Sequence, residues 1–120
     1  MGEVVDAQEL AGGLRVTAGR LCGEILASAL SKDDKRFDPA STMIVRAVWQ
    51  SYREAEVGSV DPAKPTFELD ANGITAFLRG IEGRVLTVLE CVFPPGQQCE
   101  ALKSLARQEV WETRKRVGFE

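Results

Sequence analysis

Four side chains near the C-terminus combine positive charge with an aromatic ring on one side of an expected helix. Lys103, Arg107, Trp111 and Arg114 fall within about 80° of one another at 100° per residue. Arg and Lys bind phosphate oxygens through charge-assisted hydrogen bonds, and an indole stacks on a nucleobase. Trp and Arg also anchor protein interfaces. The pattern indicates a nucleotide site or a protein contact, and a third interpretation is a partly exposed Trp111 packed under the N-terminal helices.

A second group consists of small residues on a helix that we expect over residues 70–93. Gly80, Gly83 and Thr87 lie within roughly 60° of one another, away from the apolar side of that helix. A glycine inside a helix costs roughly 1 kcal/mol relative to alanine, and the close approach of another backbone or of a ligand is the usual compensation. We therefore predict an interface formed by Gly80, Gly83, Thr87 and Trp111. Neutral variation on an exposed face is the alternative.

The chemistry of known enzymes is poorly represented in this sequence. Histidine is absent, which removes the commonest general base and transition-metal ligand. There is no phosphate-binding loop ending in Gly-Lys-Ser/Thr, no dinucleotide fingerprint and no nucleophile elbow. Cys22, Cys91 and Cys99 lack the CxxC spacing of metal and redox sites, and we expect them to be reduced thiols packed as small apolar residues. We expect no catalytic residue, no metal and no cofactor.

Length and composition suit one globular domain over residues 1–120, with a helical region over 1–69 and a helical hairpin over 70–120. Hydrophobic residues make up 44% and charged residues 28% of the chain. The net charge of −3 argues against a DNA-binding role. No apolar run is long enough to cross a membrane, and the N-terminus does not read as a signal peptide. We expect a cytoplasmic protein.

Two helices are expected in the N-terminal region. Asp6 and Glu9 have the spacing of a capping box, and apolar residues then recur at helical steps up to residue 30. A β-hairpin over residues 3–17, turning at Ala11-Gly12-Gly13, is the competing interpretation. Asp38-Pro39 predicts an N-cap and first position of a helix ending near Gly58. Its expected apolar side comprises Val45, Val48, Trp49, Tyr52 and Ala55.

The C-terminal region has the clearest helical pattern. After a briefly extended segment at residues 66–69, Asp70 is the expected N-cap of a helix that Pro94-Pro95-Gly96 must end. Its apolar seam comprises Ile74, Leu78, Ile81, Val85, Val88 and Val92. A last helix over 97–117 should fold back antiparallel, with Leu102, Leu105, Ala106 and Val110 facing inward. The expected fold is all-α, with four helices ending in an antiparallel hairpin.

Part of this hairpin resembles a known family. Phe93-Pro94-Pro95-Gly96, then Ala101-Leu102-x-x-Leu105 and Trp111, is similar to the helical hairpin of bacteriophage anti-CBASS and anti-Thoeris sponge proteins. The resemblance covers residues 81–111. This chain departs from the family pattern at Lys103-Ser104 and Glu112-Thr113, where the family has Thr-Lys and Ala-Asn. The resemblance implies a homo-oligomer without enzymatic activity that sequesters cyclic nucleotide signals of bacterial immunity.

The resulting hypothesis is a phage anti-defence protein in the bacterial cytosol that captures a cyclic nucleotide at a subunit interface. Lys103, Arg107 and Arg114 would hold phosphates and Trp111 would stack on a base. The runner-up is a protein inhibitor or adaptor of the anti-CRISPR kind that binds a host defence protein through an acidic surface. Its carboxylates would include Glu54, Glu56, Glu68 and Asp70. A carboxylate-based nucleotide hydrolase is the third hypothesis.

Overall fold

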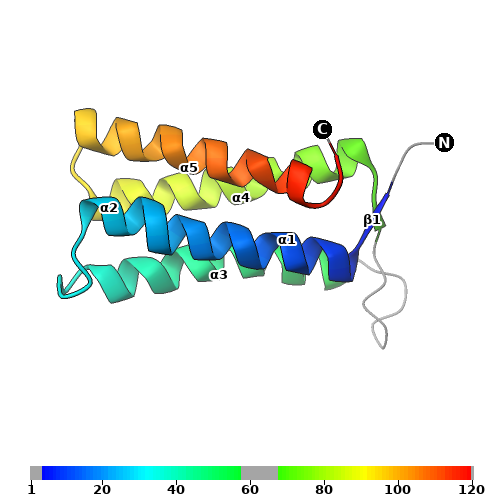
Figure 1. Cartoon of the computed structure of the whole chain (residues 1–120), viewed down its shortest axis with the longest axis horizontal. Coiled ribbons are helices and arrows are strands. Elements are labelled where there is room, and N and C mark those ends of the chain that lie inside the picture. Colours follow the sequence, from blue (N-terminus) through cyan, green and yellow to red (C-terminus); the bar gives the residue numbers. More distant parts are fainter. Residues whose placement is uncertain (1–3, 58–67, 120) are drawn as a thin grey trace.

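The computed structural model describes residues 4–57 and 68–119, and these form a four-helix bundle (Figure 1). The first bundle helix is continuous through α1 (Ala7–Arg20), the π-helical segment η1 (Leu21–Leu26) and α2 (Ala27–Ala29). It is followed by α3 (Phe37–Val57), α4 (Ala71–Val92) and α5 (Gln97–Arg116). The expected all-α fold with a C-terminal helical hairpin is confirmed.

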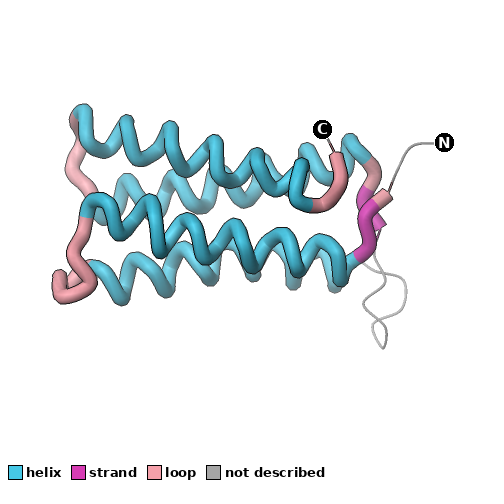
Figure 2. Tube along the Cα trace, in the orientation of Figure 1, coloured by secondary structure: helices cyan, strands magenta, loops and turns pink. Residues whose placement is uncertain are grey.

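The helices run alternately up and down and are almost parallel to the long axis of the molecule (Figure 2). α1 packs on α3 and α5, and α4 packs on the same two helices, so α1 and α4 occupy opposite corners of the bundle. Each helix therefore turns one side to the core, two flanks to its neighbours and one side outward. The candidate functional residues lie on the outward sides of α3 and α4 and on the flank of α5 that faces α4.

The core confirms the predicted seam of α4. Ile74, Leu78 and Ile81 are completely buried and belong to the same apolar cluster as Leu10 and Leu14 of α1. Trp49 of the predicted inward side of α3 is only half-buried, and the predictions for α3 and α5 were wrong at Val45 and Leu105, which are 37% and 46% exposed. On a helical wheel these two side chains lie roughly 90–110° from the middle of the buried residues of their helices. The inward sides are instead formed by Ala40, Ile44, Ala47 and Val48 in α3 and by Cys99, Leu102, Ala106 and Val110 in α5.

Both predicted caps at Asp6 and Asp70 are confirmed. Each carboxylate accepts a backbone hydrogen bond of 2.8 Å, from Glu9 N and Gly73 N respectively. A small antiparallel sheet lies directly before these caps and joins β1 (Val5–Asp6) to β2 (Glu68–Leu69). The strand at the N-terminus thus pairs with a distant segment, and residues 7–17 are helical rather than part of a local hairpin. Of the segment expected to be extended, residues 66 and 67 lie outside the described residues.

The start of α3 differs from the prediction. Asp38 is not the N-cap, because the helix already begins at Phe37, after a turn in which Phe37 N donates to Asp34 O. Pro39 nevertheless stays in the first turn, where its missing N–H leaves no intrahelical bond unmade. The C-terminal end at Val57 agrees with the expected end near Gly58.

The contact between α1 and α5 explains one of the two adjacent glycines of α1. A Cβ atom on Gly13 would lie 2.7 Å from Val117 Cγ1, so any larger residue would force Val117 to move away from α1. One turn further along α1, Thr17 hydrogen-bonds to Thr113 of α5 in the buried interface. Arg116 donates to Thr17 and pairs with the buried Glu109, so part of the C-terminal basic cluster serves the fold.

Candidate ligand-binding and contact surfaces

Two of the three predicted cations of α5, Lys103 and Arg107, lie along its seam with α4 and meet carboxylates there. Lys103 Nζ lies 3.1 Å from a carboxylate oxygen of Glu90 in α4 and 3.1 Å from one of Glu100 in α5. Its side chain is only 14% exposed. The hydrogen bond to Glu90, and to a smaller extent that to Glu100, raises the pKa of Lys103 above its ordinary value. The charge of Lys103 is therefore already balanced within the chain.

Arg107 and Trp111 share a third carboxylate. Arg107 Nε lies 3.5 Å from Glu82 Oε1, and the indole Nε1 of Trp111 donates to the same oxygen at 3.4 Å. Trp111 is half-buried and packs on the core. In Arg114 the buried Nε has no hydrogen-bond partner among the described residues. The roles of Glu82 and Glu90 as partners of α5 could not be inferred from the sequence, because both contacts join two helices.

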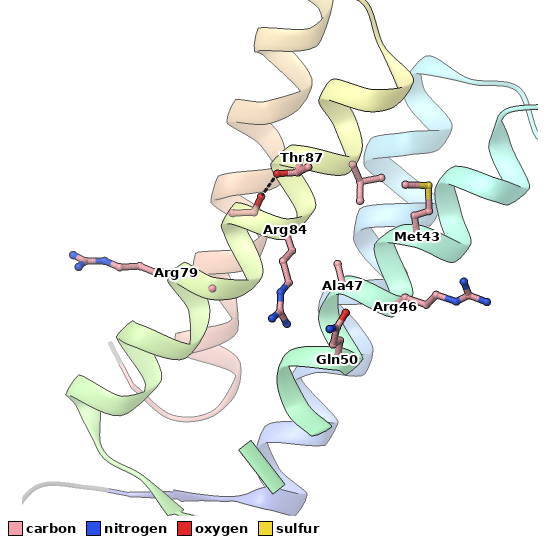
Figure 3. A pocket seen from close by; sticks show the side chains of 10 residues that line it. Met43, Arg46, Ala47, Gln50, Arg79, Arg84 and Thr87 are labelled. Atoms are coloured by element: carbon pink, nitrogen blue, oxygen red, sulfur yellow. Dashed lines mark hydrogen bonds between the residues drawn. The ribbon is translucent and has the colours of Figure 1, made fainter. Parts of the chain in front are cut away.

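The small-residue face of α4 is open. A Cβ atom on Gly80 or Gly83 would meet nothing within 4 Å, so none of the described helices packs there. The two glycines and Thr87 line a groove of about 530 Å³ between α3 and α4 (Figure 3). Trp111 does not line this groove and lies at the α4–α5 seam. The structure thus separates Trp111 from the other three predicted interface residues.

Three arginines surround this groove. Arg84 points between the two helices, where it donates to Ser51 Oγ at 2.8 Å and to both carboxylate oxygens of Glu54 at 2.9 Å. Arg46 and Arg79 extend to opposite sides of the groove (Figure 3). Within residues 4–57 and 68–119, neither of these two has a hydrogen bond or an ion pair. Arg46 and Arg79 therefore place positive charge at the rims of the groove that no described carboxylate balances.

A second hollow, of about 260 Å³, lies on the outward side of α3 and was missed from the sequence. Arg46, Trp49 and Arg53 follow one another at steps of three and four residues and fall within about 60° on the helical wheel. Trp49 had been assigned to the apolar side of the helix. These three residues share one side of the helix in the same way as the predicted α5 residues, so their grouping could have been predicted from the sequence.

Three side chains of this α3 hollow have polar groups without a partner among the described residues. No hydrogen bond or ion pair to any described residue engages Arg46, Arg53 or the indole Nε1 of Trp49. The half-buried ring of Trp49 is held edge-on by Tyr52, with ring centroids 5.5 Å apart. Two guanidinium groups beside an anchored indole can hold phosphate oxygens and stack on a planar ring.

Other kinds of site find little support in the described part of the chain. It contains no group of three or more Cys, Asp or Glu side chains placed to hold a metal ion. None of its helices combines the length and apolar character needed to cross a membrane. Comparison with family models, curated proteins and solved structures finds no match to this chain. The groove between α3 and α4, the α3 hollow and the α4–α5 seam are therefore the features that indicate a function.

Proposed function

We propose that this chain is a non-enzymatic binding protein that captures a phosphate-bearing molecule with a planar aromatic ring, of the nucleotide class, on the outward side of α3. One observation carries the proposal: Arg46 and Arg53 flank Trp49 around a hollow, and none of the three has its polar groups engaged by a described residue. Arg46 and Arg53 supply the phosphate contacts, and Trp49 supplies the stacking surface.

The energetics favour this α3 hollow over the α5 seam. A hydrogen bond to a charged group contributes about 1.5–3 kcal/mol, and stacking on an aromatic side chain about 1–3 kcal/mol per base. A ligand at Arg46 and Arg53 gains these contacts without breaking an internal pair. A phosphate at Lys103 must instead compete with Glu90 and Glu100, which already neutralise the ammonium group.

The hairpin resemblance supplies the biological setting of the proposal. It favours a phage protein that acts in the bacterial cytosol as a homo-oligomer and sequesters a cyclic nucleotide immune signal. Sequestration needs affinity and copy number rather than turnover, so the absence of histidine is no obstacle. Symmetric copies would present several α3 hollows to ligands with more than one phosphate.

The acidic-adaptor hypothesis loses support from two of its carboxylates. Both carboxylate oxygens of Glu54 accept hydrogen bonds from Nη2 of Arg84, and Asp70 caps the N-terminus of α4. The side chain of Glu56 lies outside the described residues. We therefore keep nucleotide capture as the proposed function.

The two tryptophans allow a direct test, because each candidate surface contains one. W111F leaves Trp49 as the fluorophore, and W49F leaves Trp111. We expect cyclic di- and trinucleotides to quench the fluorescence of W111F and to raise its melting temperature by mass action. Linear ADP serves as the comparison ligand.

The same titration separates the competing outcomes. Quenching confined to W49F would move the ligand to the α5 seam and contradict the α3 site. The absence of quenching and of any thermal shift at high micromolar concentrations of every nucleotide would contradict nucleotide capture itself.

A further inference from the structure

We propose that the groove between α3 and α4 receives a second copy of this chain, with α4 packing antiparallel on α4 of that copy. Ala76, Gly80, Gly83 and Thr87 follow one another at steps of four, three and four residues, which is the spacing of a seam between two helices. All four are small and none is buried. The seam is separate from the buried apolar seam of the same helix.

The groove is shaped for a helix backbone rather than for a bulky side chain. Gly80 and Gly83 expose the backbone of α4, and a Cβ on either would meet nothing within 4 Å. Met43, whose side chain is 41% exposed, and Ala47 supply apolar surface from α3. Each glycine costs about 1 kcal/mol inside a helix, and no contact among the described residues offsets that cost. Close helix packing between copies does offset it.

Charge complementarity identifies the occupant and its direction. Arg79 and Glu90 are eleven residues apart, which places them within about 20° of each other on the same flank of α4. Arg79 has no partner among the described residues. Glu90 forms an ion pair with Lys103 through Oε1, and its side chain is still 56% exposed. In a parallel pair, Arg79 would face the opposite flank of α4 in the second copy, which carries Arg84 and no carboxylate. In an antiparallel pair it faces Glu90, twice by symmetry.

The register follows from the same residues. Centring the antiparallel pair between Gly83 and Arg84 sets Gly80 opposite Thr87 of the second copy. Arg79 then lies two residues, about 3 Å along the axis, from the level of Glu90, well within the reach of its side chain. The contact is two-fold symmetric and closes as a dimer. It does not require a ligand in the α3 hollow, so the dimer and nucleotide capture can fail independently.

The test is the solution mass of the full chain as a function of concentration, by light scattering or sedimentation. We expect twice the monomer mass of 13.1 kDa for the parent protein. R79E and E90R should each weaken the dimer by about ten-fold, because like charges then face each other at both ends. The double variant R79E/E90R should restore it, because the pairs re-form with exchanged signs. R15E, which changes an exposed arginine of α1, is the control.

G83L separates the dimer from monomer folding. Leucine is a better helix former than glycine and has open space at this position, so the monomer should melt at the same or a higher temperature. The dimer should be lost, because the leucine side chain fills the seam. A parent protein that stays at 13.1 kDa at all concentrations overturns the proposal. So does a dimer that tolerates G83L, or a double variant that associates no better than the single ones.

Discussion

Two surfaces of this bundle carry the same kinds of residue and differ in what those residues do. On α5, Trp111 stands among cations whose charges are largely balanced by carboxylates. On α3, Trp49 stands between two arginines that no described residue neutralises. Even the two indole N–H groups differ, because that of Trp111 donates to Glu82 and that of Trp49 has no acceptor among the described residues.

The difference comes from the neighbours of each helix. The Trp111 surface of α5 leans on α4, and the near flank of α4 presents Glu82 and Glu90. The Trp49 surface of α3 points away from the other helices, and no described carboxylate contacts it. A pattern of cations around a tryptophan is thus ambiguous on one helix alone. Its place in the bundle decides whether it joins two helices or is left free for a partner.

The largest effect is expected when the charges of the two surfaces are reversed in turn. R46E/R53E should weaken nucleotide binding by at least about 100-fold, because two charge-assisted contacts are lost and replaced by repulsion. R107E should change the affinity by less than about three-fold, because that arginine already serves Glu82. Calorimetric titration of the three proteins with the same cyclic nucleotide measures the contrast.

R15E is the matched control for a reversed charge on an outward helix side. It should bind like the parent, which excludes a general effect of net charge. If R107E proved the more damaging variant, the assignment of ligand binding to α3 would be reversed in favour of α5.

The helices and their ends could be predicted because the signals for them are local. The buried seam of α4 is a periodic pattern within one helix, and Asp6 and Asp70 cap the turns that directly follow them. Proline after Phe93 ends α4 for reasons of backbone chemistry alone. None of these features depends on where another element lies.

Features that depend on two elements could not be read in the same way. The β1–β2 pair joins residues more than sixty positions apart, and the close contact at Gly13 requires α5 beside α1. The exposure of Leu105 follows from how α5 is rotated in the bundle. The partners of the α5 cations were missed for this reason, since Glu82 belongs to another helix.

A smaller effect should appear in stability rather than in binding. E82Q weakens the acceptor shared by Arg107 and Trp111, and we expect a loss of about 1–2 kcal/mol of unfolding free energy. R53Q should change the stability by less than about 0.5 kcal/mol, because it breaks no contact among the described residues. Urea denaturation followed by circular dichroism measures both. Equal losses of unfolding free energy in the two variants would contradict the distinction between the Trp111 surface, which holds α5 to α4, and the Trp49 surface, which holds no second helix.

The smallest effect concerns the alkaline limit of stability. The hydrogen bonds to Glu90 and Glu100 raise the pKa of Lys103 in the folded chain above its ordinary value of 10.5. A raised pKa means that the stabilising contribution of Lys103 is fully present below that ordinary value and is lost as the pH rises through the folded value. The difference in urea midpoint between the parent and K103M should therefore stay constant up to about pH 10 and shrink above it. The arginines of the α3 hollow keep their charge over the same range, so nucleotide binding by K103M should match the parent throughout. A midpoint difference that persisted unchanged well above the folded pKa would show that the Lys103 side chain stabilises α5 by packing its aliphatic stem rather than by its charge.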